Sequence, residues 1–544
     1  MLFRSGAADT LTVTLTGASL TNVTGGAFSN VESVTVNLGT AAADNNDTLS
    51  YGTSGSAATV NLTAGSATGF ASILGIDNVT GGSGNDTIAG NAAVNTLNGG
   101  AGDDTINWTI GQGADNIDGG TGVLDRLVIT GSALVSDTLN VILTGAALTS
   151  VTGGTLAGIE QITLDMLGQA AGVGDRLSYG ASTGNATIVL STSGVAGAVG
   201  SASGFLSIQG VESATGGAGN DTISGDSGNN TLIGGAGTDT LSYANATAGV
   251  SVSLSITVAQ ATVGAGSDTV SQFENLTGSA FNDTLSGSNG VNVLNGGLGV
   301  DTLSYANSTA SMTVNMATGT SAGFGADTFS NFENLTGSNQ ADNLTGDANV
   351  NSINGAGGAD TMTGGGGADI IDTGAADDNV TDIIRFTATG DYGDTVNNLD
   401  ATGSAANVDH IRFSAALQTA FDDVTVNNVI AFVSGNNGGG QVTTDLTTAE
   451  ALMLLSGEGV ATLDLTSASV VAAAFNAEFI LSGADGLDAL LVINDSTAAS
   501  NDAAVWQWVQ AAGGTAGVDA GELTFIGLLH ANAEVTTANF DFGP

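Results

Sequence analysis

A run of five consecutive nine-residue units, from Gly337 to Thr381, constrains the fold of this chain more than any other feature. The units are GSNQADNLT, GDANVNSIN, GAGGADTMT, GGGGADIID and TGAADDNVT. Each has a glycine-containing loop, then aspartate or asparagine at the sixth position, and most have an aliphatic residue at the eighth. In a two-sided coil, sixth positions eighteen residues apart stack on one edge. We therefore expect one edge to carry Asp342, Asp360 and Asp378, and the other Asn351 and Asp369.

The same unit recurs in three earlier blocks, which begin at Gly81, Gly216 and Gly278. Every block has two aspartates eighteen residues apart: Asp86 and Asp104, Asp221 and Asp239, Asp283 and Asp301, Asp342 and Asp360. The unit between them carries an asparagine: Asn95, Asn230, Asn292 or Asn351. An asparagine offers a neutral oxygen and no charge, so we expect the aspartate-lined edge to hold cations more tightly.

Longer repeats connect these blocks. The segment 9–36 returns at 137–164, and DTLSYANATAG at 239 returns as DTLSYANSTAS at 301. Apolar and small polar residues alternate in these segments, which predicts strands. We predict solenoid modules at 1–130, 131–242, 243–304 and 305–381, with roll blocks at 81–118, 216–242, 278–304 and 337–381. The extra residue before Asp125 is expected to end the first block, and the tyrosines that follow D-[TR]-L-S mark a structural position: Tyr51, Tyr179, Tyr243 and Tyr305.

The predicted fold class is all-β, a right-handed parallel β-solenoid or β-roll. The apolar residue two positions after each aspartate should point inward, and one half-turn cannot bury it alone, so the turns must stack. From residue 382 to 544 the repeats stop, and we expect a smaller mixed α/β C-terminal domain. Its predicted strands include VDHIRFSAAL and DALLVINDS, and its predicted short helices are TTAEALMLLSG and DAAVWQWVQAAG.

Composition indicates what such a chain can bind. The 52 acidic and five basic residues, with no lysine, give a formal charge of −47. Such a surface repels nucleic acid and anionic membranes, and the natural small partner is a divalent cation. The chain has no cysteine, no apolar run long enough for a membrane span and no apolar signal-peptide core at its start. The 42% hydrophobic residues favour a folded chain, provided that the charge is neutralised.

Calcium is the cation that this pattern fits best. It takes about six to eight oxygens from carboxylates, carbonyls and water. A G-G-x-G-x-D loop supplies carbonyls from glycine positions and charge from the aspartate, so we expect several calcium ions between stacked loops. The predicted aspartate ligands are Asp86, Asp104, Asp115, Asp221, Asp239, Asp283, Asp301, Asp342, Asp360, Asp369 and Asp378. The predicted glycine positions are Gly81, Gly82, Gly84, Gly99, Gly100, Gly102, Gly216, Gly217, Gly219, Gly234, Gly235, Gly237, Gly296, Gly297, Gly299, Gly364, Gly365 and Gly367.

The units GGSGNDTIA, GGAGDDTIN, GGAGNDTIS and GGAGTDTLS resemble the repeats-in-toxin (RTX, haemolysin-type) calcium-binding family of bacterial secreted proteins. The C-terminal segment, ending in NFDF, is similar to the segments that direct such proteins through type I secretion. The resemblance implies a chain that is exported unfolded and folds on meeting calcium outside the cell.

Catalytic motifs do not stand out. The two histidines, His410 and His530, lie far apart in the sequence, and no H-E-x-x-H occurs. Without cysteine or lysine, covalent catalysis by either residue is impossible. Trp506 and Trp508 lie two positions apart, as on one side of a strand, and core packing is the favoured interpretation. We expect no enzyme activity from this chain.

Two functions remain open at this stage. The first is a structural one, as an extracellular component of a surface layer, matrix, filament or adhesin. The second is the non-catalytic secretion and folding tail of an extracellular hydrolase whose catalytic domain lies upstream. Expected partners are calcium, the type I secretion machinery through the C-terminus, and either copies of the chain itself or cell-surface glycans. Neither nucleic acid binding nor membrane insertion is expected.

Overall fold

The structure is a computed structural model, and the chain folds as two compact units, Met1–Ala280 and Phe281–Pro544. The described residues of the first unit are 10–16, 19–23, 26–27, 34–37, 47–52, 54–131, 136–144, 147–166, 175–190 and 200–280. Those of the second are 281–374, 380–388, 391, 393–399, 409–414, 430–436, 442–445, 450–456, 466–469, 471–473, 479–482, 488–494, 501–509, 523–531 and 539–541.

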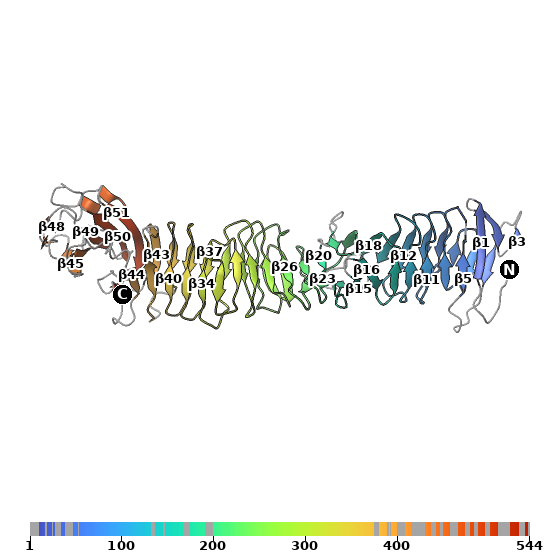
Figure 1. Ribbon diagram of the computed structural model, residues 1–544, viewed down its shortest axis with the longest axis horizontal. Coiled ribbons are helices and arrows are strands. Elements are labelled where there is room, and N and C mark those ends of the chain that lie inside the picture. Colours follow the sequence, from blue (N-terminus) through green and yellow to red (C-terminus); the bar gives the residue numbers. More distant parts are fainter. Residues whose placement is uncertain are drawn as a thin grey trace. The chain divides into compact units, whose positions relative to one another are not determined.

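In the first half of the first unit, successive strands alternate between two parallel faces (Figure 1). One face contains β1 (Thr10–Thr16), β5 (Thr48–Ser50), β9 (Asn78–Thr80), β11 (Thr96–Asn98), β13 (Asn116–Asp118) and β17 (Thr155–Ala157). The other contains β6 (Thr59–Asn61), β10 (Thr87–Ala89), β12 (Thr105–Thr109), β14 (Arg126–Thr130), β18 (Gln161–Asp165) and β22 (Ser207–Gln209). The parallel coils that the sequence predicts are therefore present.

The second half of this unit repeats the arrangement. One face contains β15 (Thr138–Thr144), β19 (Arg176–Ser178), β23 (Ser213–Thr215), β25 (Thr231–Ile233) and β29 (Gly266–Ser271). The other contains β20 (Thr187–Val189), β24 (Thr222–Ser224), β26 (Thr240–Ser242) and β30 (Asn275–Thr277). The remaining short strands are β2 (Ser19–Val23), β3 (Gly26–Ala27), β4 (Thr35–Asn37), β7 (Ser66–Ala67), β8 (Ser72–Leu74), β16 (Ala147–Val151), β21 (Ser201–Ala202), β27 (Ser251–Ser253) and β28 (Gln260–Val263).

The predicted duplication appears in the structure. Strand β1 pairs antiparallel with β2 and β15 with β16, and both pairs shift register at the equivalent place, after Thr14 and after Ile142. The two segments therefore have the same fold, including the same irregularity in strand pairing.

The second unit continues the same two-faced pattern. One face contains β31 (Thr284–Ser286), β33 (Thr302–Ser304), β37 (Asn334–Thr336), β39 (Ser352–Asn354), β41 (Ile370–Asp372) and β43 (Asp394–Leu399). The other contains β34 (Thr313–Asn315), β38 (Asn343–Thr345), β40 (Thr361–Thr363), β42 (Ile383–Phe386), β44 (His410–Phe413) and β52 (Phe540–Asp541). A wider coil also contributes β35 (Thr320–Ala322) and β36 (Thr328–Ser330), and β36 pairs with β32 (Val293–Asn295).

The C-terminal segment extends the β43 face with long strands. In spatial order these are β51 (Leu523–Ala531), β50 (Asn501–Val509), β49 (Asp488–Asn494), β47 (Glu450–Ser456) and β45 (Ile430–Asn436). Strands β46 (Val442–Asp445) and β48 (Phe479–Ser482) pair separately. Residues 468–469 and 471–473 are helical.

The two helices predicted for TTAEALMLLSG and DAAVWQWVQAAG are wrong, because these stretches form strands β47 and β50. Strand β47 pairs on both sides, with β45 and β49, and β50 pairs with β49 and β51. Tertiary pairing overrides local helix propensity in these stretches. The expected packing of the tryptophans is confirmed, since Trp506 and Trp508 are both buried and Trp506 lies edge-on to Phe525 at a centroid distance of 5.0 Å.

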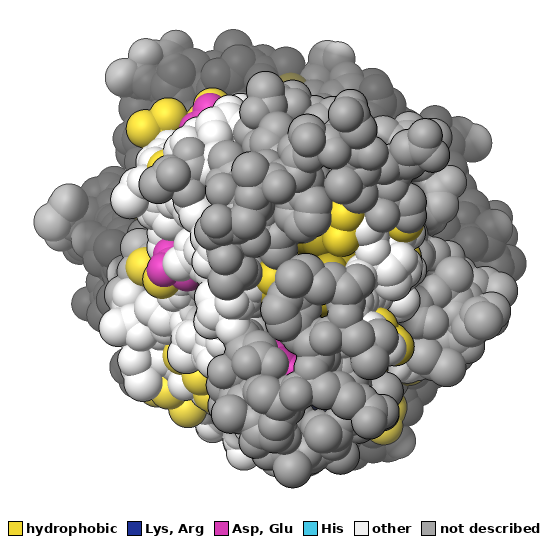
Figure 2. Space-filling model, turned by 90° about the vertical axis from the view of Figure 1, so that its right-hand side faces the viewer, with side chains coloured by type: hydrophobic (Ala, Val, Ile, Leu, Met, Phe, Trp, Pro, Cys, Tyr) yellow, Lys and Arg dark blue, Asp and Glu magenta, His cyan; other side chains and the backbone are white. Residues whose placement is uncertain are grey.

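The core is a stack of aliphatic side chains between the two faces. Ile88, Leu97 and Ile106 of the first block are fully buried, as are Leu344 and Ile353 of the last. These eighth-position residues confirm the inward direction expected from the sequence. On the face that Figure 2 shows, the coloured side chains are hydrophobic or acidic, and no basic side chain is seen among the described residues. No helix in the described part of the chain is long and apolar enough to cross a membrane.

Candidate metal centres

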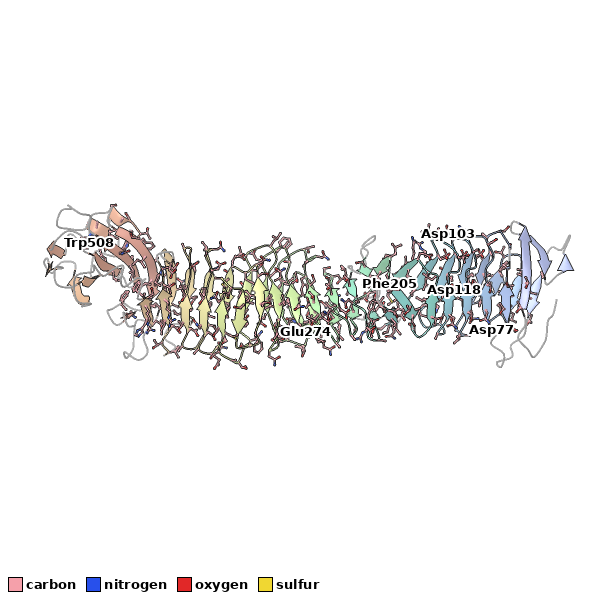
Figure 3. All side chains as sticks on the ribbon, viewed as in Figure 1. Asp77, Asp103, Asp118, Phe205, Glu274 and Trp508 are labelled. Carbon is pink, nitrogen blue, oxygen red and sulfur yellow. The ribbon has the colours of Figure 1, made fainter. Side chains whose placement is uncertain are left out.

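Columns of carboxylates run along the edges of the rolls, and each carboxylate accepts a backbone N–H from the preceding coil. Asp86 Oδ1 accepts from Ala58 N at 2.7 Å, and Asp104 Oδ1 accepts from Asp86 N at 2.7 Å. These aspartates directly precede β10 and β12, so parallel strand pairing places them above one another. Figure 3 shows side chains along both edges of the first unit, with Asp103 at one edge and Asp77 at the other.

The other blocks build the same column. An upper carboxylate accepts the N–H of the residue below in the pairs Asp239 to Asp221, Asp301 to Asp283, Asp360 to Asp342 and Asp369 to Asn351. The donor–acceptor distances are 2.7, 2.8, 2.8 and 2.8 Å in that order. The stacking predicted from the eighteen-residue spacing is confirmed for these pairs.

One expectation about the columns is corrected, and one column extends beyond its predicted block. Asp378 lies outside the described residues, and the residue that follows Asp360 in its column is Asp382, whose Oδ1 accepts the Asp360 N–H at 2.7 Å. Asp125 continues the column of the first block, because its Oδ1 accepts the Asp104 N–H at 2.7 Å, and it is the last aspartate of that column. Both steps are longer than eighteen residues, at 22 and 21, so a loop insertion hides them from a strict nine-residue period.

In three columns, both carboxylate oxygens of the first aspartate accept backbone N–H groups, one from its own loop and one from the coil below. The Oδ2 atoms of Asp86, Asp221 and Asp342 accept backbone N–H groups of Gly82, Gly217 and Ser338, respectively, while Oδ1 accepts from the coil below. We call these loops closed loops. Their carboxylates have ordinary hydrogen-bond partners at both oxygens.

Other aspartates of the columns lie in a different environment. No hydrogen-bond partner is found among the described residues for the buried Oδ2 atoms of Asp104, Asp175, Asp239, Asp301 and Asp369. Each of these aspartates is less than 2% exposed. An unpartnered buried polar atom costs about 1–3 kcal/mol, and more when it is charged. These carboxylates therefore need a partner that the described part of the chain does not supply.

Glycine conformation separates the second group of loops from the closed ones. The residue at the second position of the loop has positive φ at Gly100, Gly235, Gly297 and Gly365, with values of +103°, +115°, +111° and +99°. Only glycine adopts such conformations readily. The fourth-position residues Gly102, Gly237, Gly299 and Gly367 also have positive φ. We call these loops open loops. In contrast, Gly82, Gly84, Gly217 and Gly219 of the closed loops do not have positive φ, and close approach of the neighbouring coil excludes a Cβ there.

The first glycine of each unit leaves room for oxygens to converge. A Cβ on Gly81 would lie 1.9 Å from Gly99 O and 2.3 Å from Asp86 Oδ2. A Cβ on Gly99 would lie 2.4 Å from Asp104 Oδ2. The same convergence of a carboxylate oxygen and a carbonyl of the next coil occurs at Gly216, Gly234 and Gly296. Only glycine leaves the space that these oxygens occupy.

Burial raises the pKa of the open-loop carboxylates. Together with the nearby carboxylates of Asp86, Asp125 and Asp103, it raises the pKa of Asp104 to about 7. Burial likewise raises the pKa of Asp239, and that of Asp301, to about 6. These shifts measure how poorly the protein alone tolerates the negative charge. A bound cation would reverse that preference.

Asp115, another predicted ligand, belongs to the opposite edge. Its Oδ1 accepts the Asn95 N–H at 2.8 Å, and among the described residues its Oδ2 has no hydrogen-bond partner. Burial raises its pKa to about 6.

The donor set fits a hard cation such as calcium. All the converging atoms are oxygens, from one carboxylate and from backbone carbonyls. No group of three or more histidine, aspartate or glutamate side chains that could hold a metal occurs among the described residues. Carbonyls must therefore supply much of any coordination shell, as calcium allows and as soft-ligand metals do not favour.

Comparison with known families agrees with this chemistry. The model of the RTX calcium-binding nonapeptide repeat (4 copies) matches residues 74–106, 209–242, 272–303, 327–362, 336–371 and 345–380. The chain carries RTX calcium-binding repeats. These RTX matches include every closed and open roll loop described above. No curated protein matches the chain.

Sequence reasoning missed the acidic residues that end five of the carboxylate columns. Five acidic residues accept the N–H of the last aspartate with a side-chain oxygen: Asp77 from Asp47, Glu160 from Asp125, Glu212 from Asp175, Glu274 from Asp239 and Glu333 from Asp301. Each of the five also donates its own backbone N–H to the carbonyl of that aspartate. We call them terminators. Their signal was present in the sequence, as the acidic residue of GIDN, GIEQ, GVES and the two FENL motifs.

The terminators explain the asparagines of the RTX blocks. The backbone N–H of a terminator donates to the coil below. Only its backbone carbonyl therefore remains available to accept a hydrogen bond from the coil above. Asn95 Nδ2 donates to Asp77 O at 2.7 Å, Asn230 Nδ2 to Glu212 O at 3.2 Å and Asn351 Nδ2 to Glu333 O at 3.1 Å. An aspartate cannot make this bond. These asparagines thus act as amide donors in the structure, a role that the sequence interpretation did not foresee.

The recurrent tyrosines close the wider coils. Tyr51 and Tyr179 donate to backbone carbonyls of Thr68 and Ser203. Tyr243 and Tyr305 donate instead to the carboxylates of Asp268 and Asp327, at 2.8 and 3.2 Å. All four are buried, as expected for a structural position.

Proposed function

We propose that this protein is a secreted, non-catalytic calcium-binding RTX protein that folds on extracellular calcium and serves as a structural component of a surface layer, matrix, filament or adhesin. One observation carries the proposal. Buried carboxylate oxygens that find no partner among the described residues recur in the open loops of both units, and a bound cation would satisfy them.

The charge of the chain supports calcium-dependent folding. With a formal charge of −47, the carboxylates repel one another whenever calcium is scarce. The open loops place aspartates in successive coils, so repulsion acts along each column. Calcium binding and folding are then coupled, because the ligands come together only when the coils stack. This coupling suits export of an unfolded chain through a type I system from a low-calcium cytosol.

Circular dichroism and size-exclusion chromatography test the calcium dependence. We expect a compact β-rich species in millimolar calcium and an expanded chain after chelation. Magnesium at the same ionic strength is the control, because it prefers octahedral water-rich shells and should not replace calcium. An identical β spectrum and elution volume in chelator would contradict the proposal.

Electron microscopy separates the structural role from the alternative, a folding tail of an upstream hydrolase. The structural role predicts lattices or filaments, or binding to cell-surface glycans, in the presence of calcium. Dispersed single particles without glycan binding, together with a catalytic motif upstream in the gene, would support the tail.

A further inference from the structure

The carboxylate columns continue beyond the last RTX repeat into coils of a different sequence. Asp369, the sixth residue of GGGGADIID, is followed in its column by Asp394, the first residue of β43. Asp394 Oδ1 accepts the Asp369 N–H at 2.9 Å. The step is 25 residues, and the RTX match ends at residue 380, so Asp394 belongs to no repeat unit.

Two carboxylate oxygens converge at this step. A Cβ on Gly364 would lie 2.3 Å from Asp369 Oδ2 and 2.9 Å from Asp394 Oδ2. At Gly81 and Gly216 the equivalent point has one carboxylate oxygen and one carbonyl oxygen. Gly364 is the one glycine opening a described roll unit whose nearest atoms include carboxylates of two different residues. At this point two carboxylates, rather than one carboxylate and one carbonyl, are available to a cation.

Both carboxylates are deeply buried and the first lacks a partner. Asp369 and Asp394 are each 1% exposed, and Asp369 Oδ2 finds no hydrogen-bond partner within the described part of the chain. A third acid, Asp391, is 3% exposed but already engaged, because its Oδ2 accepts from Thr387 and Ala388. Asp391 adds negative potential near Asp369 and Asp394, and its Oδ2 is already occupied by these hydrogen bonds.

The position of Asp394 connects the roll to the C-terminal sheet. Strand β43 pairs parallel with β41 of the last repeat on one side and with β51 on the other. Asp394 is opposite Gly527 of β51, and a Cβ on Gly527 would lie 2.6 Å from Asp394 O. Gly393 N also donates to Ile526 O at 2.6 Å. A ligand that fixes the position of Asp394 therefore also fixes the residue at which β51 begins to pair with β43.

The geometry points to a calcium site between Asp369 and Asp394, outside the repeat pattern, that fastens the C-terminal sheet to the last coil of the roll. Without a cation, the two carboxylates repel each other where β43 pairs with β41 of the last repeat. With calcium, they become joint ligands, and backbone carbonyls and water complete the shell. This inference rests on the proposed calcium dependence of the whole roll.

Calcium counting on the full chain tests the site. Asp394→Asn keeps an oxygen that can accept the Asp369 N–H and removes the charge. We expect it to bind one calcium ion fewer than the wild type by isothermal titration or equilibrium dialysis. Limited proteolysis should then release C-terminal fragments at calcium concentrations that protect the wild type.

Two matched variants make the result specific. Asp104→Asn, in an open loop of the first unit, should also lose calcium but should leave C-terminal protection unchanged. Asp391→Asn removes a nearby charge whose Oδ2 is already hydrogen-bonded, and we expect it to keep the full calcium count. Gly364→Ala leaves both carboxylates and fills the point on which they converge, so it should lose the same ion as Asp394→Asn.

The possible failures are distinguishable. If Asp104→Asn loses calcium while folded Asp394→Asn or Gly364→Ala retains the full count, the junction site is overturned and the proposed function stands. If the wild type binds almost no calcium, both fail. Loss of calcium without any change in C-terminal protection would overturn the fastening role.

Discussion

Glu274 Oε2 accepts the backbone N–H of Asp239 at 2.8 Å. The equivalent bond one coil earlier is the one in which Asp239 Oδ1 accepts the backbone N–H of Asp221. A glutamate thus takes the position of an aspartate in the column. Glu274 differs in that its own N–H also donates to Asp239 O, at 3.1 Å. This reciprocal pair ends the column, because no N–H remains for the next coil.

Removing the terminator should leave a buried amide unsatisfied. We expect Glu274→Ala to destabilise the calcium-loaded protein by about 1–3 kcal/mol, measured by urea denaturation. Glu274→Gln keeps an oxygen acceptor and should cost much less. Equal losses of stability from the two substitutions would show that the hydrogen bond from Asp239 N–H to Glu274 does not account for the effect.

Open and closed loops should differ in calcium binding. Asp104→Asn removes a carboxylate whose Oδ2 has no partner among the described residues, whereas Asp86→Asn removes one whose oxygens already accept two N–H groups. We expect Asp104→Asn to cause the greater loss of calcium affinity in titration calorimetry. A larger effect at Asp86 would contradict the assignment of open loops as the metal centres.

The asparagine after a terminator should not be replaceable by aspartate. Asn351→Asp places an acceptor against the Glu333 carbonyl, so we expect a loss of about 1–3 kcal/mol even in saturating calcium. Asn339→Asp, on an exposed loop of the same roll, adds the same charge and is the control. A stabilised Asn351→Asp protein with an additional calcium ion would refute the donor role.

Ala356 has a positive φ of +74° at the second position of GAGGADTMT, where other open loops have glycine. The left-handed region costs a residue with a Cβ about 1–2 kcal/mol. We therefore expect Ala356→Gly to raise the thermal midpoint in calcium. Ala348→Gly, at an exposed loop position without positive φ, should be neutral or destabilising.

The metal-free protein should be more stable in acid than at neutral pH. Burial first, and neighbouring carboxylates second, raise the pKa of Asp104 to about 7 and that of Asp239 to about 6, from an ordinary 3.8. The folded state then holds more protons than the unfolded state, so stability falls as pH rises from about 4 to about 7. Circular dichroism in chelator at pH 5 and pH 7.5 checks the direction, with more β structure expected at pH 5. Millimolar calcium should restore stability at pH 7.5, and a chelated protein that gains stability with rising pH would contradict these shifts.

Local sequence predicted the regular part of the molecule well. The nine-residue period correctly paired Asp86 with Asp104 and Asn351 with Asp369, and it correctly buried Ile88 and Leu344. Such features follow from local geometry, since each unit needs the same loop and the same inward side chain. The prediction missed the steps where the period changed, from Asp360 to Asp382 and from Asp104 to Asp125.

The sequence by itself determined the stacked coil, its core positions and the oxygen-rich edges, because these repeat every nine residues. Only the tertiary structure decided which residue ends a column and which carboxylate oxygens find no hydrogen-bond partner among the described residues. The reason is that a hydrogen bond such as that from Asp239 N to Glu274 Oε2 joins residues 35 positions apart. The tertiary structure likewise decided that residues 450–456 and 501–509 are strands, since neighbours on both sides supply the backbone partners that a helix would otherwise provide.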